Sequence, residues 1–85
     1  MMTYEIRFKK QAKKFINSRN SKEKHRILHE IFKLPYGENI KKMRDRKNCY
    51  RLRVGDYRII YEKYKDIFLI EVVEIDNRGD IYWVQ

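Results

Sequence analysis

The stretch Cys49–Glu62, CYRLRVGDYRIIYE, decides the fold of this 85-residue chain. Apolar residues recur at every second position on both sides of Gly55 and Asp56, a period that is typical of strands with one buried face. Gly-Asp between two such runs predicts a two-residue hairpin turn, which places Val54 opposite Tyr57. The residues predicted to face the core are Tyr50, Leu52, Val54, Tyr57, Ile59 and Tyr61.

The chain before this hairpin is expected to begin with a strand and to continue as two helices. Residues 3–8 alternate in polarity, whereas residues 9–17 carry apolar side chains at helical spacing. Asn20 is the predicted N-cap of a second helix, with Glu23 at its third position, and this helix should stop before Pro35. Because the turn between them is short, the two helices should form an antiparallel hairpin.

The remaining segments complete the predicted sheet. Residues 38–48 are basic and show no clear period, which predicts a loop or a short edge strand. Residues 67–73 are almost wholly apolar and predict a central strand covered on both faces, whereas residues 76–80 should form a turn. We therefore expect one domain over residues 1–85, of the α+β class. It would comprise an N-terminal strand, a helical hairpin and three antiparallel strands forming one twisted sheet, in the order β-α-α-β-β-β.

The charge balance points to a polyanionic partner. The chain has 21 Lys and Arg against 12 Asp and Glu, a formal net charge of +9, and such a field attracts nucleic acid above all. The alternative is a lysine-rich surface that serves solubility or ion-pair networks. No apolar stretch approaches a membrane span, no signal peptide is evident, and the lone Cys49 excludes an internal disulfide. We expect a soluble cytoplasmic protein with no membrane partner.

Three arginines of the hairpin are predicted to share one face of the sheet. Arg51 and Arg53 lie two residues apart, and the turn places Arg53 opposite Arg58. Like charges across a ladder are destabilising, so Arg58→Ala is expected to be neutral or stabilising by up to about 1 kcal/mol. A bound polyanion would reverse this repulsion, and the planar guanidinium group matches phosphate oxygens. The alternative is an exposed face whose arginines pair with Glu62, Glu71 or Glu74.

Further candidate RNA contacts flank this face. Arg78 follows the last core strand, where loops often carry function, and the ring of Tyr82 can stack on a base or bond to a ribose hydroxyl. Taken alone, Tyr82 is better explained as a terminal aromatic residue packed on the sheet. The basic segment before the hairpin adds Lys42, Arg44, Arg46 and Lys47 as candidate RNA-binding residues.

A metal or cofactor site is not predicted. His25 and His29 have the spacing of metal ligands on a helix, but the sequence offers no third ligand. Three glycines form no phosphate-binding loop, and no pair of carboxylates suggests acid–base catalysis. We therefore expect a protein that works without a metal ion or a cofactor.

Cys49–Glu62 resembles the hairpin of the RelE/ParE toxin superfamily, and Arg78–Tyr82, RGDIY, is similar to the Arg-x-x-x-Tyr element that closes those toxins. Chain length and element order agree, so the resemblance covers essentially the whole chain, although it is less specific to a target within the superfamily. In the RelE branch it implies the toxin of a type II toxin–antitoxin pair. Such a toxin cleaves messenger RNA in the A site of the 70S ribosome, without a metal ion, by attack of a ribose 2′-hydroxyl on the adjacent phosphate.

The resemblance also implies roles for single residues. Arg51 and Arg53 match the basic pair of RelE toxins, and Arg58 matches their transition-state arginine. Arg78 matches the residue proposed to protonate the leaving oxygen, and Tyr82 matches the aromatic residue that stacks on or orients the substrate.

One departure concerns the basic pair, which is often lysine in RelE toxins. Arginine stays protonated in proteins, so proton abstraction by Arg51 or Arg53 is hard to defend, and the same objection weakens Arg78 as an acid. The expected contribution is electrostatic: fixed cations face the developing phosphorane charge while the ribosome aligns the 2′-hydroxyl. Arg44 falls near a further arginine of the RelE site.

Two other functions stay open: a ParE-type toxin that inhibits DNA gyrase without cleaving RNA, and an RNA-binding module without activity. Within the RelE interpretation, the resemblance implies a RelB-like antitoxin that is acidic, complements the charge of +9, and wraps the toxin through amphipathic helices and an added strand. The complex would be a higher hetero-oligomer.

Overall fold

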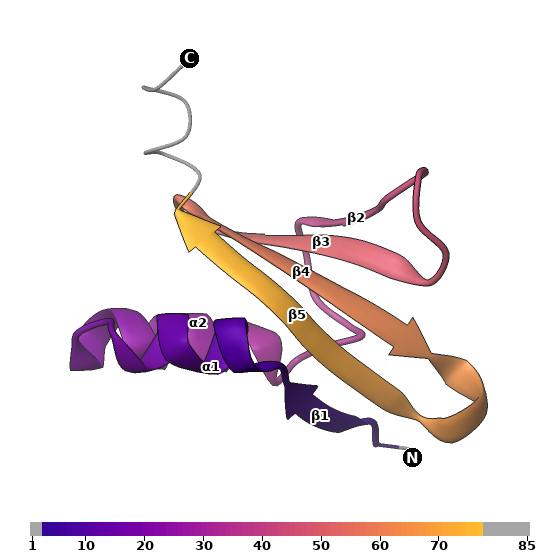
Figure 1. The fold of residues 1–85 in the computed structure, drawn as a ribbon, viewed down its shortest axis with the longest axis horizontal. Coiled ribbons are helices and arrows are strands. Elements are labelled where there is room, and N and C mark those ends of the chain that lie inside the picture. Colours follow the sequence, from indigo (N-terminus) through magenta and orange to yellow (C-terminus); the bar gives the residue numbers. More distant parts are fainter. Residues whose placement is uncertain (1–2, 78–85) are drawn as a thin grey trace.

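The computed structural model describes residues 3–77, which form one sheet with two helices on one of its faces (Figure 1). In chain order the elements are β1 (Glu5–Phe8), α1 (Lys10–Asn17), α2 (Ser21–Ile31), β2 (Ile40–Lys42), β3 (Cys49–Val54), β4 (Tyr57–Tyr64), the 3₁₀ helix η1 (Lys65–Ile67) and β5 (Leu69–Asn77).

The sheet has the strand order β1-β5-β4-β3-β2, and the predicted α+β class is confirmed. The pairs β2–β3, β3–β4 and β4–β5 are antiparallel, whereas β1 runs parallel to β5. The sheet is therefore mixed rather than wholly antiparallel. A helical crossover follows β1 in place of a hairpin turn, so no turn motif in the sequence sets the direction of this strand.

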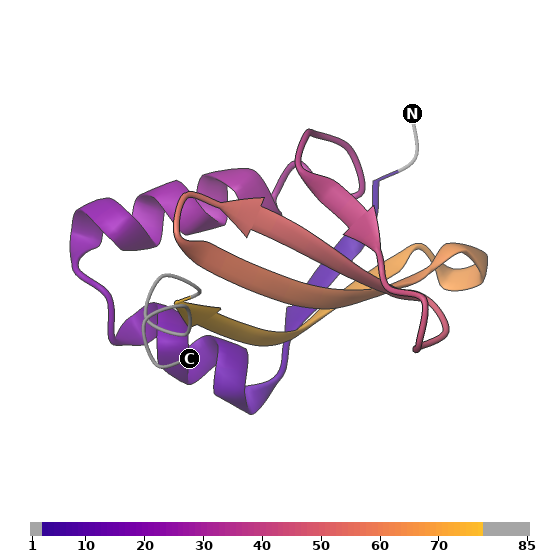
Figure 2. The ribbon, with the colours of Figure 1, turned by 90° about the horizontal axis from the view of Figure 1, so that it is seen from above.

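The two helices cover neighbouring parts of the sheet. α1 packs mainly on β5 and α2 on β3, as the view from above shows (Figure 2). The predicted N-cap is confirmed, because the Asn20 side chain accepts a hydrogen bond of 2.9 Å from the Glu23 backbone N–H. Phe32 is the C-cap of α2, and its side chain is 61% exposed.

The β3–β4 hairpin has the predicted register, with Val54 opposite Tyr57 and Arg53 opposite Arg58. Gly55 has φ +58°, the left-handed conformation that a first turn residue of this kind requires. The Arg26 guanidinium lies against the turn so closely that a Cβ at Gly55 would be 2.5 Å from its Nη2.

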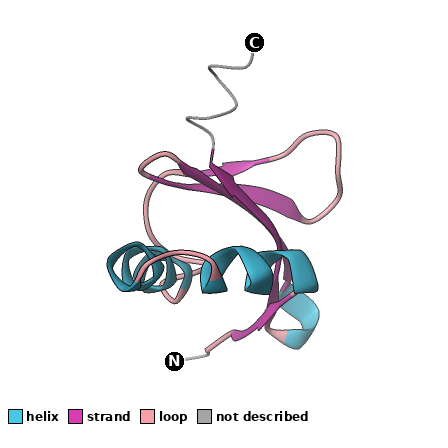
Figure 3. Ribbon diagram, turned by 60° about the vertical axis from the view of Figure 1, so that its left-hand side comes forward, coloured by secondary structure: helices cyan, strands magenta, loops and turns pink. Residues whose placement is uncertain are grey.

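The core lies between α1, α2 and one face of the sheet, and neither of these helices lies on the opposite face (Figure 3). We call this second face the open face. The core residues are Ala12, Ile16, Ile27, Ile31, Leu34, Leu52, Val54, Tyr57, Ile59, Tyr61, Ile70, Val72 and Ile75. Because successive side chains of a strand point to opposite faces, the residues between these core positions of the strands lie on the open face.

Two strands, β2 and β5, differ in detail from the prediction. The basic stretch before the hairpin contains the short edge strand β2, one of the two predicted alternatives. The interior strand is confirmed but shifted: it begins after Phe68, whose φ of +50° breaks the extended run, and it continues to Asn77. The prediction that both of its faces are covered is wrong, because the helices cover only one face of the sheet. Ile67 is consequently 66% exposed, and Asp76 lies in a strand instead of a turn.

Candidate nucleic-acid interface

Arg51, Arg53 and Arg58 form one group on the open face, which we call the arginine cluster. Arg51 lies in the ladder between Lys41 of β2 and Ile60 of β4, and Arg53 lies directly opposite Arg58. Because these positions alternate with the core residues of the same strands, the side chains project away from the helices. Arg53 is exposed, while Arg51 and Arg58 are half-buried.

Arg58 is joined to an acidic residue of the neighbouring strand. Its Nη2 donates to Asp76 Oδ2 at 2.9 Å, and the two residues are directly opposite in the β4–β5 ladder. Arg58 Nε and Asp76 Oδ1 are buried and have no hydrogen-bond partner among residues 3–77. The alternative in which the arginines of this face form ion pairs therefore holds for Arg58. Its partner is Asp76, and not Glu62, Glu71 or Glu74. The premise that Arg58→Ala would simply relieve repulsion is wrong, since a carboxylate compensates this charge.

Charge on the open face is divided between its two halves. The arginine cluster and Lys41 occupy β2, β3 and the start of β4. The acidic half occupies β5 and the rest of β4, where Glu62 is opposite Glu71 and Glu74 is opposite Ile60. A polyanion is attracted to the β2–β3 half and repelled by the β5 half, so the fold orients it toward the edge strand β2.

The loop 43–48 is fastened to the sheet through Cys49. The buried Cys49 thiol donates to Met43 Sδ at 3.7 Å and accepts from Arg46 Nη2 at 3.5 Å, and the Met43 N–H donates to the Cys49 carbonyl at 2.9 Å. The hydrogen bond to Cys49 raises the pKa of Arg46. Cys49 thus serves as a packed anchor, and it leaves Arg44 and Lys47 exposed.

The loop and the edge of the sheet enclose shallow basic hollows. One, of about 300 Å³, is lined by Lys41, Lys42, Met43, Arg44, Asp45 and Arg51. A second, of about 560 Å³, is lined by Lys42 to Lys47. The structure therefore brings Lys42 and Arg44 close to Arg51, whereas Arg53 and Arg58 line neither hollow. In the ladder Lys42 is opposite Tyr50, so its side chain lies on the helix-bearing side of the sheet.

Two predicted site residues, Arg78 and Tyr82, lie outside the described residues. Their assignment as contributors to the site stays a prediction. β5, the strand that carries Asp76, ends at Asn77, and Arg78 is the next residue in the chain.

The described part of the chain contains no cluster of three or more His, Cys, Asp or Glu that could hold a metal ion. His25 and His29 are neighbours on α2, with ring centroids 6.5 Å apart. Between residues 3 and 77 no helix is long and apolar enough to cross a membrane.

Sequence reasoning missed three contributors to this region. Asp76 was assigned to a turn, because the apolar run that predicts β5 ends before it. Lys41 becomes a neighbour of Arg51 only through the pairing of β2, for which the sequence has no turn motif. Arg26 approaches the hairpin turn from α2, a contact between helix and turn that no local pattern predicts.

Comparison with known proteins identifies a matching family. The model of the family described as ParE toxin of type II toxin-antitoxin system, parDE, matches residues 4–82. Curated proteins give no significant sequence match.

Solved structures of similar fold include two archaeal complexes. A chain of the RelE–RelB complex from Pyrococcus horikoshii OT3 is 28% identical with a TM-score of 0.78, over 92% of this chain and 98% of that chain. A chain of the RelB–RelE complex from Methanococcus jannaschii is 28% identical with a TM-score of 0.71, over 92% and 96%. The isolated E. coli RelE toxin has a TM-score of 0.72 over 96% and 94%, and at 21% identity this likeness concerns the fold alone.

Proposed function

Because the chain belongs to the ParE toxin family of type II toxin–antitoxin systems, within the RelE/ParE superfamily, we propose that it is a RelE-type endoribonuclease. Its substrate is messenger RNA in the ribosomal A site, and its effect is the arrest of translation in the cytoplasm. The observation that carries the proposal is the arginine cluster: three guanidinium groups on one solvent-facing side of a rigid two-stranded ladder.

The proposed reaction is an internal transfer at phosphorus. The ribose 2′-oxygen forms a bond to the adjacent phosphorus, the bond from phosphorus to the 5′-oxygen breaks, and a 2′,3′-cyclic phosphate remains. The 2′-hydroxyl loses a proton and the leaving 5′-oxygen gains one. The phosphorane carries additional negative charge, which fixed cations stabilise more than they stabilise the ground state. No metal ion has a role in this proposal.

The residues take different parts in this proposal. Arg51 and Arg53 bind the phosphate backbone, and the half-buried Arg58 directs the charge of its guanidinium group at the phosphorane oxygens. Asp76 accepts a hydrogen bond from Arg58 Nη2, so that this side chain is oriented before RNA arrives. Arg78 and Tyr82 complete the site, with Arg78 placed at the leaving oxygen and Tyr82 stacked on a base, as the resemblance implies.

The loop cations take the role of RNA binding. Arg44, Arg46 and Lys47 contact phosphates that flank the scissile bond, and Lys42 extends this surface around β2. Because arginine stays protonated, these groups and the arginine cluster contribute electrostatics and positioning, and proton transfer depends on other groups of the ribosome complex.

A ParE-type activity is the second candidate, because the matching family model is described as a ParE toxin. Such a toxin inhibits DNA gyrase and leaves RNA intact. The likeness at 28% identity to chains of two RelE–RelB complexes favours the RelE-type activity.

We also propose a RelB-like antitoxin as the partner. The solved complexes named above pair RelE with RelB, and this chain exposes large apolar side chains that a partner would cover: Phe32, Tyr36, Ile67 and Phe68. β2 and β1 form the two edges of the sheet and can accept an added strand. An acidic antitoxin complements the charge of +9, and the complex is a higher hetero-oligomer. A lone monomer after co-expression with its genomic neighbour would contradict this.

A translating extract separates the candidate functions. Addition of the protein should create new messenger RNA ends at fixed positions within codons, and no cuts in the same RNA without ribosomes. Intact RNA together with lost gyrase supercoiling would instead identify a ParE-type toxin. Neither effect, with RNA binding retained, would identify a binding module.

A further inference from the structure

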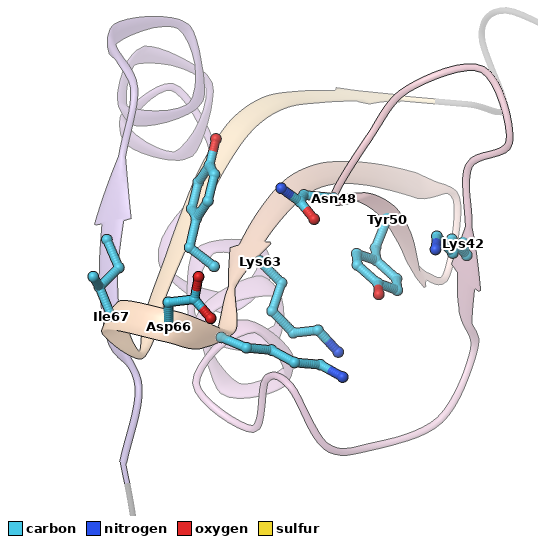
Figure 4. A pocket seen from close by; sticks show the side chains of 8 residues that line it. Lys42, Asn48, Tyr50, Lys63, Asp66 and Ile67 are labelled. Atoms are coloured by element: carbon cyan, nitrogen blue, oxygen red, sulfur yellow. The ribbon is translucent and has the colours of Figure 1, made fainter.

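A second basic hollow lies on the opposite side of the sheet from the arginine cluster. It has a volume of about 450 Å³ and is lined in part by residues of η1 (Figure 4). η1 lies at the end of the sheet away from α1 and α2 (Figure 1). We call it the lysine hollow, after Lys42, Lys63 and Lys65, which line it together with Tyr50. These residues come from β2, β4, η1 and β3, so the fold alone brings them together.

The cations of the lysine hollow have no ion-pair partner in the described part of the chain. Within residues 3–77 no carboxylate lies within 4.0 Å of the ammonium groups of Lys42, Lys63 or Lys65. Lys33, by contrast, is paired with Glu30 at 3.2 Å. Asp66 is the single carboxylate among the lining residues, so the hollow has a net positive charge.

The aromatic ring of Tyr50 lines the hollow and is stacked on a second ring. Tyr50 stacks on the buried Tyr61, with ring centroids 5.5 Å apart and an angle of 15° between the rings. The Lys63 ammonium lies 4.6 Å from the Tyr50 ring centroid, a cation–π contact that holds it at the hollow. Figure 4 shows Tyr50 between Lys63 and Lys42. The cations are therefore set around a fixed ring, which supplies a hydroxyl group as a further donor.

The lysine hollow is continuous with the arginine side of the sheet through β2. Lys42 lines both this hollow and the one that contains Arg51 and Arg44. Lys41, its neighbour in the chain, lies opposite Arg51 on the open face. Cations thus follow one another around the edge of a three-residue strand, a path that suits a chain of phosphates better than one small anion.

From this continuity we propose that the lysine hollow binds backbone phosphates of the RNA strand whose neighbouring nucleotides contact the arginine cluster. The strand passes around β2, with Lys42 at the crossing point and with Lys63 and Lys65 at its far end. This inference rests on the proposed function, because it takes RNA as the ligand of the lysine hollow. It adds a second contact region on the other face of the sheet.

The test uses binding without cleavage. The probes are a 2′-O-methyl RNA trinucleotide and a 2′-O-methyl strand of about twelve nucleotides, which lack the attacking hydroxyl. The variant is Lys63→Gln/Lys65→Gln, which removes two charges and keeps most of each stem. The matched control is Lys10→Gln/Lys22→Gln, two exposed helical lysines that have no carboxylate partner among the described residues.

We expect the Lys63→Gln/Lys65→Gln protein to bind the long strand about tenfold more weakly, with a slope of log K against log salt less negative by about 1.4. Its affinity for the trinucleotide, held by the arginine cluster, should not change. The control should match the wild type with both probes, and Lys63→Arg/Lys65→Arg should restore long-strand binding. Thermal melts show whether each protein is folded.

Loss of long-strand affinity that is equal in variant and control would overturn the inference while leaving the proposed function intact. Polyglutamate serves as a third probe. If Lys63→Gln/Lys65→Gln binds the long RNA strand as tightly as the wild type but no longer binds polyglutamate, the inference is also overturned, because the occupant would then be an acidic protein segment. A wild-type protein that binds neither RNA probe would also overturn the inference, whereas the proposed function fails only if the translating extract shows no new messenger RNA ends.

Discussion

Arg58 and Asp76 face each other across the β4–β5 ladder, with Arg58 Nη2 2.9 Å from Asp76 Oδ2. The pair lies at the border between the basic and acidic halves of the open face. Arg58 has the central role in the proposed chemistry. It is also a member of the arginine cluster that forms an ion pair with a carboxylate of the protein.

This ion pair makes a prediction for stability. Arg58→Ala leaves the half-buried Asp76 carboxylate without its partner, and should lower the free energy of unfolding by about 1–3 kcal/mol. Asp76→Ala should also destabilise, and the double variant should be more stable than the sum of the single effects predicts. Urea unfolding of the four proteins measures the coupling. A coupling energy of zero would mean that the pair contributes nothing to stability.

The arginine cluster makes a prediction for substitution by lysine. Arg51→Lys and Arg53→Lys keep the charge, so ribosome-dependent cleavage should be retained. We expect cleavage at least as fast as that of the wild type, because a lysine can lose its proton and act as a base. Lys22→Ala and Lys33→Ala, far from this face, are the controls and should leave the rate unchanged. Loss of activity in Arg51→Lys would show that bidentate geometry matters more than charge there.

Binding of a short single-stranded RNA should depend strongly on salt. Each neutralised phosphate contributes about −0.7 to the slope of log K against log salt, so Arg51, Arg53, Arg58 and Arg78 together should give about −2 to −3. Fluorescence anisotropy over a salt series measures this slope. A flat response would remove the electrostatic basis of the site.

The Asn20 cap is a test of the fold that is independent of function. Asn20→Ala removes the acceptor of the Glu23 backbone N–H, and should destabilise the protein by about 1 kcal/mol. Ser21→Ala, at the adjacent exposed position, is the control and should change stability little. Equal midpoints of urea unfolding for the two variants would contradict the assigned cap.

The sequence predicted those parts of the molecule that local rules determine. The Gly55–Asp56 turn fixed the β3–β4 register, and hence the arginine cluster, because a two-residue loop leaves one pairing. The pairings of β1 and β2 depend on packing over long separations, so neither the parallel β1 nor the Lys41–Arg51 neighbours followed from the sequence. Asp76 was missed because a strand can continue into polar residues when its neighbour continues beside it.

The central claim is tested most directly by single-turnover cleavage on programmed ribosomes with Asp76→Ala and with Arg58→Ala/Asp76→Ala. Because the double variant has no unpaired carboxylate, we expect it to stay folded. A parallel urea titration checks this. We predict that Asp76→Ala cleaves messenger RNA and that the double variant is slower by about 100-fold or more. Cleavage by the double variant at the rate of Asp76→Ala would contradict the assignment of the arginine cluster as the active site.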